Sequence, residues 1–81
     1  MEKNDFNKKL GAFIRKIRTD KSITQQELAD KMNLDFQYIS RIERGLISPT
    51  LFWLVNLIEA LDCSEVDFFD NFKRYRNLKS D

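Results

Sequence analysis

Apolar side chains recur every three or four residues along most of the chain, a spacing that places them on one face of a helix. The first series is Phe6, Leu10, Ile14 and Ile17, with polar and charged residues between them. It predicts a helix over about residues 5–20. No segment shows the strict alternation of a half-buried strand. Comparable series predict four more helices, over about residues 24–32, 36–44, 50–61 and 65–74.

The segments between these helices supply recognisable helix ends. Thr24 and Glu27 have the spacing of a capping box, in which each side chain accepts a hydrogen bond from the other residue's backbone amide. Asn33 can take the left-handed conformation that ends a helix, Asp35 can cap the next helix, and Gly45 is a typical C-terminal glycine. The turn between helices two and three is therefore about three residues long, as in a helix-turn-helix unit.

The composition limits the classes of function. The chain has 81 residues, so we expect a single domain over residues 1–81. It contains one Cys and no His, which excludes a disulfide framework and argues against a zinc site or a His-based catalytic group. We therefore expect no enzyme activity, no metal and no cofactor, and no small-molecule ligand is evident.

No segment has the length of a membrane span. The longest uninterrupted apolar run is LFWLV at residues 51–55. The N-terminal MEKNDFNKKL is charged where a signal peptide would have an apolar stretch. We expect a soluble, cytoplasmic protein without a membrane partner.

Charge is arranged in blocks, although the net charge is only +1. Residues 1–54 carry ten basic and seven acidic groups, whereas residues 55–72 carry five acidic groups and no basic one. Residues 73–81 carry four basic groups and one acidic group. If the chain binds a polyanion, segment 55–72 is expected to face away from it.

A longer pattern surrounds the predicted helix-turn-helix, in the segment TQQELADKMNLDFQYISRIERGLISPT. Its distinctive residues are Thr24-Gln25, Glu27-Leu28-Ala29, Ile39-Ser40, Ile42-Glu43, Gly45 and Pro49. With these residues the chain resembles the lambda-repressor-like (Cro/cI-type, XRE) helix-turn-helix family over about residues 10–69. The resemblance implies an all-α fold, a compact five-helix lambda-repressor-like DNA-binding domain with its helix-turn-helix at helices two and three.

Within that family, the stretch NLDFQYISRIERG is most similar to the small controller proteins of restriction–modification systems. The resemblance implies a sequence-specific regulator of transcription, such as a repressor, that binds palindromic operators in double-stranded DNA as a homodimer. Three positions depart from the family pattern. Ser22 stands where Gly often ends helix one. Asn33 stands where the turn usually carries Gly, and Phe36 stands where relatives often have a polar residue that touches bases.

If helix three is the recognition helix, its outward residues meet base edges in the major groove. Gln37 can bond both N6 and N7 of adenine, and Arg41 can bond both O6 and N7 of guanine. Phe36 either contacts a thymine methyl group or packs against the protein. Tyr38 offers a ring and a hydroxyl to a base or to a phosphate.

The resemblance also implies contacts outside the base edges. Gln25 looks like the family's phosphate contact, with local bonding as the alternative. Arg44 and Ser48 are placed to hold the DNA backbone beyond helix three, although Arg44 could only complement the helix dipole and Ser48 could be a simple loop residue. Arg18 and Glu43 match an ion pair that commonly ties helix one to helix three, a structural role.

The predicted fourth and fifth helices carry more large apolar residues than one inward stripe can use. The inward stripe of helix four consists of Leu51, Leu54, Leu57, Ile58 and Leu61. The surplus consists of Phe52, Trp53, Val55, Phe69 and Phe72. An exposed apolar patch usually marks an interface, so we expect this surplus to form a homodimer interface. The alternative is that Phe68 and Trp53 complete the core of a monomer.

Two alternative functions use the same scaffold. An antitoxin-type regulator would bind both DNA and a toxin. A pure protein-interaction module would show no affinity for DNA that falls with salt, which a phosphate-binding protein must show.

Overall fold

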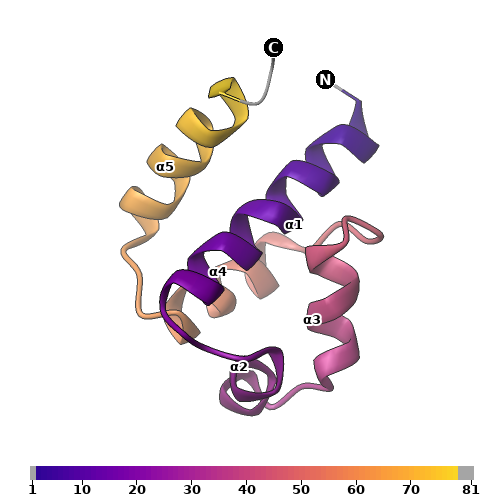
Figure 1. Cartoon of the computed structure of the whole chain (residues 1–81), viewed down its shortest axis with the longest axis vertical. Coiled ribbons are helices and arrows are strands. Elements are labelled where there is room, and N and C mark those ends of the chain that lie inside the picture. Colours follow the sequence, from indigo (N-terminus) through magenta and orange to yellow (C-terminus); the bar gives the residue numbers. More distant parts are fainter. Residues whose placement is uncertain (1, 79–81) are drawn as a thin grey trace.

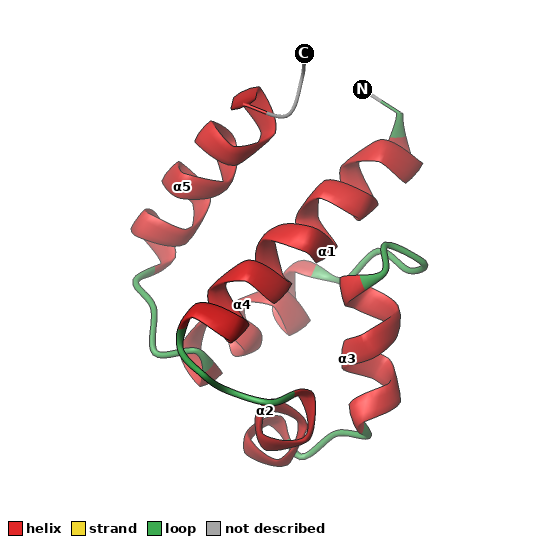
Figure 2. Cartoon of the chain, viewed as in Figure 1, coloured by secondary structure: helices red, strands yellow, loops and turns green. Residues whose placement is uncertain are grey.

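The computed structural model of the chain describes residues 2–78, and this range contains five helices and no strand (Figure 1, Figure 2). The helices are α1 (Lys3–Asp20), α2 (Gln25–Met32), α3 (Phe36–Glu43), α4 (Leu51–Ala60) and α5 (Glu65–Leu78). The all-α, five-helix fold class is confirmed. None of these helices is both long and apolar enough to cross a membrane.

Side chains that accept hydrogen bonds from the backbone form the N-terminal caps of α2 and α3. The Thr24 hydroxyl accepts a hydrogen bond from the Glu27 amide at 3.0 Å, and the Glu27 carboxylate accepts one from the Thr24 amide at 2.8 Å. The bond from the Thr24 amide lowers the pKa of Glu27 from its usual value. Asn33 then takes the left-handed conformation, and Asp35 accepts from the Gln37 amide at 2.9 Å. Short-range bonds thus set the start of α3.

α1 lies at the centre of the fold, with α3 on one side and α5 on the other (Figure 1). α2 packs against both α3 and α4. The buried apolar residues are Leu10, Phe13, Ile14, Leu28, Ala29, Ile39, Ile42, Leu54, Leu57, Ile58, Leu61, Phe68 and Phe72. They come from all five helices, so every helix contributes to one core.

The end of α5 corrects two expectations from the sequence. The helix continues to Leu78, beyond its expected end, and Phe72 is buried at 5% exposure instead of being available to a partner chain. Both differences arise because α5 packs along α1. The Phe13 ring centroid lies 5.4 Å from that of Phe72 and 5.3 Å from that of Tyr75. The Arg76 guanidinium lies 5.6 Å from the ring centroid of Phe6, in α1. These contacts hold the polar, basic end of α5 against α1.

Candidate nucleic-acid interface

The polar residues of α3 lie on the face turned away from the core. Ile39 and Ile42 are buried, whereas Gln37, Arg41 and Arg44 are exposed. The exposed residues are four and three positions apart, so they follow one another along one side of the helix. The structure therefore brings together three of the residues that the sequence predicts for DNA binding.

Phe36 begins the same helix and is not part of the core. Its side chain is 43% exposed. An aromatic ring with this exposure is available to a partner surface. Phe36 therefore does not pack in the core of the protein.

A buried network of charged and polar groups joins α3 to α1 and α2. Arg18 donates from Nε to Glu43 Oε2 at 2.6 Å and from Nη2 to Glu43 Oε1 at 2.9 Å, which makes a bidentate ion pair. Arg18 Nη1 also donates to the Ile23 carbonyl at 2.7 Å. Gln25 Nε2 donates to Glu43 Oε1 at 3.0 Å. The ion pair that the resemblance implies therefore also holds the start of α2 against the end of α3.

Gln25 makes a local bond, the alternative to its expected phosphate contact. That bond uses one of its two amide hydrogens, and the second hydrogen can still donate to a phosphate oxygen. Gln25 is half-buried at the first position of α2, where the backbone amides and the helix dipole favour an anion. The network thus orients Gln25 without removing it from the candidate interface. Hydrophobic periodicity carries no signal for the Gln25–Glu43 bond.

Tyr38 lies at the edge of the exposed polar face of α3, one turn before Arg41. Its ring packs edge to face with Trp53 of α4, with ring centroids 5.2 Å apart and planes at 69°. Both residues are half-buried. The sequence predicts Trp53 on a free surface, in the dimer interface. In the structure, Trp53 packs against the candidate DNA-binding helix instead.

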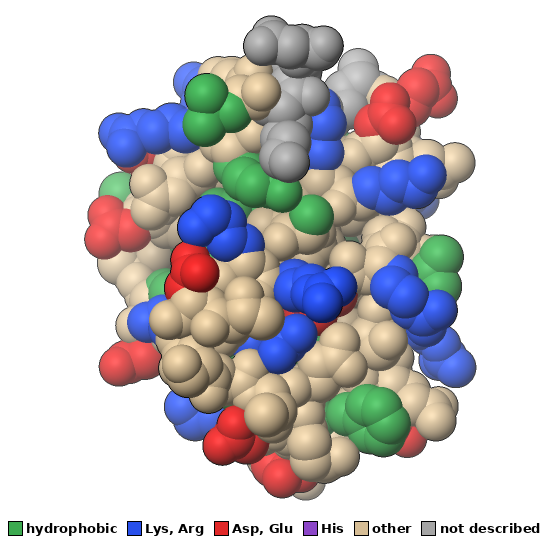
Figure 3. All heavy atoms as spheres, viewed as in Figure 1, with side chains coloured by type: hydrophobic (Ala, Val, Ile, Leu, Met, Phe, Trp, Pro, Cys, Tyr) green, Lys and Arg blue, Asp and Glu red, His purple; other side chains and the backbone are tan. Residues whose placement is uncertain are grey.

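Basic side chains are prominent over α1 and α3 in a space-filling view of the molecule (Figure 3). α1 carries Lys8, Arg15 and Lys16 as exposed residues, and α3 adds Arg41 and Arg44. Lys16 pairs with Asp20 at 2.8 Å and lines a groove between α1 and α5, whereas Arg41 and Arg44 attract a polyanion to the polar face of α3.

A model of the helix-turn-helix family matches residues 14–68, which is more than half of the chain. The match includes α2, α3 and the network that joins them. The chain belongs to this helix-turn-helix family.

Individual relatives agree with the family match. The chain is similar to the uncharacterized HTH-type transcriptional regulator y4dJ of Sinorhizobium fredii (strain NBRC 101917 / NGR234), with 35% identity over 63 residues, 78% of this chain and 82% of that protein. Its fold is similar to a crystal structure of the restriction–modification controller protein C.Esp1396I, a tetramer in complex with its natural 35 base-pair operator. That likeness has a TM-score of 0.79 and 40% identity, and it covers 84% of this chain and 90% of that chain.

A single-substitution variant of the same controller protein gives a TM-score of 0.83 with 39% identity, over 91% of this chain and 92% of that chain. The helix-turn-helix protein thus has the lambda-repressor-like fold, with α2 and α3 as its motif. One of its relatives is a transcriptional regulator by name, and another, the controller protein, is seen in complex with its operator.

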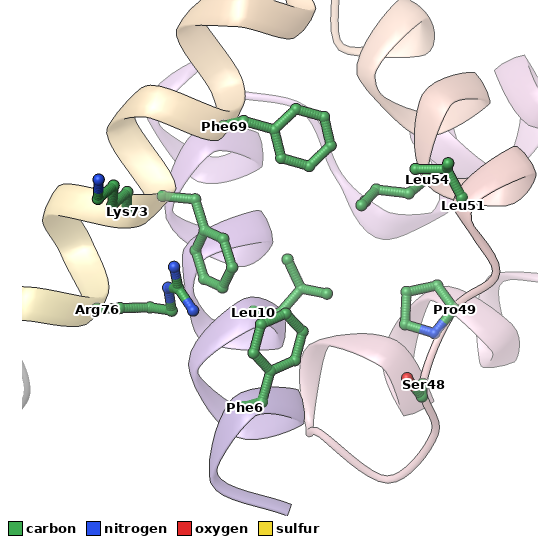
Figure 4. Close-up of a pocket in the computed structure, with 10 residues that line it drawn as sticks. Phe6, Leu10, Ser48, Pro49, Leu51, Leu54, Phe69, Lys73 and Arg76 are labelled. Carbon is green, nitrogen blue, oxygen red and sulfur yellow. The ribbon is translucent and has the colours of Figure 1, made fainter. Parts of the chain in front are cut away.

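The loop after the helix-turn-helix turns back toward α1. Gly45 has φ +75°, and a Cβ atom there would lie 2.7 Å from the Lys8 Cα, so the position requires glycine. Ser48 lies farther along this loop, at a groove of about 440 Å³ that Phe6 and Pro49 also line (Figure 4). The structure therefore places Ser48 at this groove, between α1, α4 and α5.

Apolar residues of α4 and α5 lie at this groove and outside it. Phe69 is exposed on the groove wall and Val55 is half-buried, whereas Phe52 is 80% exposed and lines a separate groove beside α2. Leu51, which the sequence placed in the inward stripe, is 69% exposed because it begins α4 at the edge of the core. Val66 is also exposed. We call these five residues the α4–α5 apolar surface.

Helical spacing could have identified the two residues of the α4–α5 apolar surface that the sequence analysis missed. Leu51 lies one turn before Val55, and Val66 lies one turn before Phe69. Figure 4 shows Leu51 and Phe69 on opposite sides of the groove. The surface therefore extends across both helices, although Phe72 and Trp53 are not exposed parts of it.

Proposed function

We propose that the protein is a sequence-specific regulator of transcription that binds double-stranded operator DNA as a homodimer and controls a restriction–modification system. The observation that carries the DNA-binding role is the exposed polar face of α3, which the network of Arg18, Glu43 and Gln25 holds in a fixed orientation. Support for the controller role is the 40% identity to a controller protein whose structure contains its operator.

In this mechanism α3 lies in the major groove. Gln37 pairs with an adenine, Arg41 pairs with a guanine, and the exposed ring of Phe36 contacts a thymine methyl group. Gln25 and Arg44 bind phosphates on either side and fix the position of the helix on the duplex. These side chains bind bases and phosphates and take part in no covalent step, so the proposed role is binding and not catalysis.

The α4–α5 apolar surface joins two protomers in the same proposal. Large exposed apolar residues are typical interface anchors, and Phe52 and Phe69 are the aromatic ones here. A two-fold dimer places two copies of α3 about 34–36 Å apart, one turn of DNA, which matches a palindromic operator.

Selection of binding sites from a random duplex pool tests the proposed function. We expect the purified protein to enrich a palindromic site, and we expect its affinity for that site to fall steeply between low and moderate salt because phosphate contacts release counterions. No enrichment together with no salt-dependent DNA binding would overturn the proposal and favour a protein-interaction module.

Replacing Arg41 with alanine is expected to cost about 1–3 kcal/mol of binding free energy on the selected site and to relax its preference at one base pair. The reason is the loss of a bidentate bond to guanine, which no water molecule replaces with the same geometry. Competition binding on the selected site and on single-base variants measures both effects.

The matched control for Arg41→Ala is Arg74→Ala. Arg74 is an exposed arginine of α5 that pairs with Asp70 at 2.9 Å, and its loss is expected to leave the base preference unchanged. An equal loss for Arg41→Ala on all sequences would show that Arg41 binds a phosphate and does not specify a base.

Phe52→Ala is expected to weaken dimer formation by roughly 1–2 kcal/mol while leaving the protomer folded, because the ring is exposed in the single chain and buried only between copies. Sedimentation equilibrium across micromolar concentrations measures the association. Leu46→Ala is the control, since Leu46 is an exposed apolar residue outside the α4–α5 apolar surface. A wild-type protein that sediments as a monomer throughout this range would contradict the dimer.

A further inference from the structure

The contact between Tyr38 and Trp53 links the candidate recognition helix to α4. The two rings meet edge to face at 5.2 Å, and both side chains are half-buried. An aromatic pair in this geometry is attractive beyond the burial of its area. The orientation of the Tyr38 ring on α3 is therefore set by a residue that lies fifteen positions away in the sequence, on another helix.

The Tyr38 hydroxyl remains available to a partner. Among residues 2–78 it makes no hydrogen bond, and it is not one of the buried polar atoms that lack a partner. The ring is held from one side while its polar end stays accessible. This is the arrangement in which a hydroxyl can donate to an acceptor on another molecule.

Trp53 contributes its ring and not its polar group. The indole Nε1 is buried and has no hydrogen-bond partner among the described residues. Leaving a buried donor unpaired is unfavourable, so hydrogen bonding does not explain a tryptophan here. The packing of the indole against the Tyr38 ring explains the tryptophan at this position.

We propose that Trp53 is a positioning residue, which holds the Tyr38 ring so that its hydroxyl donates a hydrogen bond to an acceptor oxygen or nitrogen of the bound DNA. This inference rests on the proposed function, because it assumes that α3 binds DNA. It gives Trp53 a role inside the protomer, in place of the dimer contact that the sequence suggested.

Two substitutions of Trp53 distinguish the role of its aromatic ring from the role of its apolar volume. Trp53→Phe keeps an aromatic ring beside Tyr38 and removes the unpaired donor. Trp53→Leu keeps apolar volume against the core and removes the ring. The proposal expects Trp53→Phe to retain the DNA affinity of the wild type and Trp53→Leu to lose it in part, although both variants fold.

Nuclear magnetic resonance of the free protein tests the contact between Tyr38 and Trp53 without DNA, and with only two tyrosines in the chain their ring signals are readily assigned. In Trp53→Leu, the ring protons of Tyr38 are expected to shift because the ring current of the neighbouring indole is lost. Tyr75, which packs 5.3 Å from Phe13 instead, is the internal control and is expected to stay unchanged. Unchanged Tyr38 resonances in Trp53→Leu would overturn the proposal.

A double-mutant cycle on the selected duplex tests the link to DNA. Tyr38→Phe, which removes only the hydroxyl, is expected to lower affinity about threefold to tenfold, the usual net effect of one hydrogen bond. Trp53→Leu is expected to give a comparable loss, and the double variant is expected to bind no more weakly than Tyr38→Phe alone. Additive losses, or full affinity in Trp53→Leu, would contradict a role through the hydroxyl.

The same measurements on an unrelated duplex identify the acceptor. Equal losses on both duplexes assign the hydroxyl to a phosphate, and a loss confined to the selected duplex assigns it to a base. A wild-type protein that binds no duplex would overturn the proposed function itself, and with it this role of Trp53. A wild-type protein that binds its site while Trp53→Leu binds equally well would overturn only this inference.

Discussion

Replacing Arg18 with alanine is expected to lower the free energy of unfolding by about 3–5 kcal/mol. The substitution removes both hydrogen bonds to Glu43 and the bond to the Ile23 carbonyl. The Glu43 carboxylate is almost fully buried, so it is left as a buried charge whose remaining partner is the neutral amide of Gln25. Urea denaturation followed by circular dichroism measures the loss, which is a large share of the total stability of a domain of this size.

A double substitution separates the loss of stability caused by removing one partner from the net stability that the intact ion pair contributes. Two charges taken out of water lose hydration, so an intact buried pair contributes far less than its rupture costs. Arg18→Met combined with Glu43→Leu leaves no buried charge, and we expect it to recover most of the stability that Arg18→Ala loses. A loss below about 1 kcal/mol for Arg18→Ala would place the pair among ordinary exposed ion pairs and contradict its burial.

The starts of the helices could be predicted from the sequence because their causes are local. The capping box of Thr24 and Glu27 and the cap formed by Asp35 act over two or three residues, so their spacing is visible in the sequence itself. The stripes of apolar residues likewise indicated most of the core. In the helix caps, residues that are close in the sequence are also in contact in the structure.

The features that the sequence did not indicate depend on which helices meet. α5 extends to its observed end because Phe72 and Tyr75 pack on α1, and Trp53 is half-buried because Tyr38 lies beside it. Helical periodicity predicts that a side chain points toward some neighbour, but it does not identify that neighbour. For this reason the sequence pattern alone predicts a surface between chains for both Phe72 and Trp53.

The candidate site also has some features that follow from helical spacing and others that depend on which helices meet. The exposed face of α3, with Gln37 and Arg41, follows from helical spacing once Ile39 and Ile42 are taken as inward. The pairing of Arg18 with Glu43, 25 residues apart, was accessible only through resemblance to a family. The addition of Gln25 to that pair required the three-dimensional arrangement of α1, α2 and α3.

Gly11→Ala is expected to destabilise the protein by about 1–3 kcal/mol, although alanine normally stabilises a helix relative to glycine. Gly11 lies within α1 and faces the end of α3. A Cβ atom at this position would lie 2.6 Å from the Glu43 carbonyl oxygen and 2.8 Å from its carbonyl carbon, and it would also overlap the Ile42 carbonyl oxygen. These are backbone atoms, which cannot rotate aside as a flexible side chain can. α1 and α3 must therefore move apart.

The opposing gain in helix propensity is about 0.5–1 kcal/mol and does not offset this overlap. Ala12→Gly is the matched control, because Ala12 is the exposed neighbour of Gly11 in the same helix. There we expect a loss of only about 0.5–1 kcal/mol, from propensity alone. Urea denaturation of both variants compares the two effects directly.

The consequence of Gly11→Ala for DNA binding follows from the same overlap. Glu43 supplies both the carbonyl that the new methyl group meets and the carboxylate that Arg18 and Gln25 bind. Moving α3 away from α1 therefore strains the network that orients Gln25 and displaces Arg41 relative to the start of α2. We expect a loss of affinity for the selected site in protein that is still folded. A Gly11→Ala protein that is more stable than the wild type would show that α1 and α3 separate without cost.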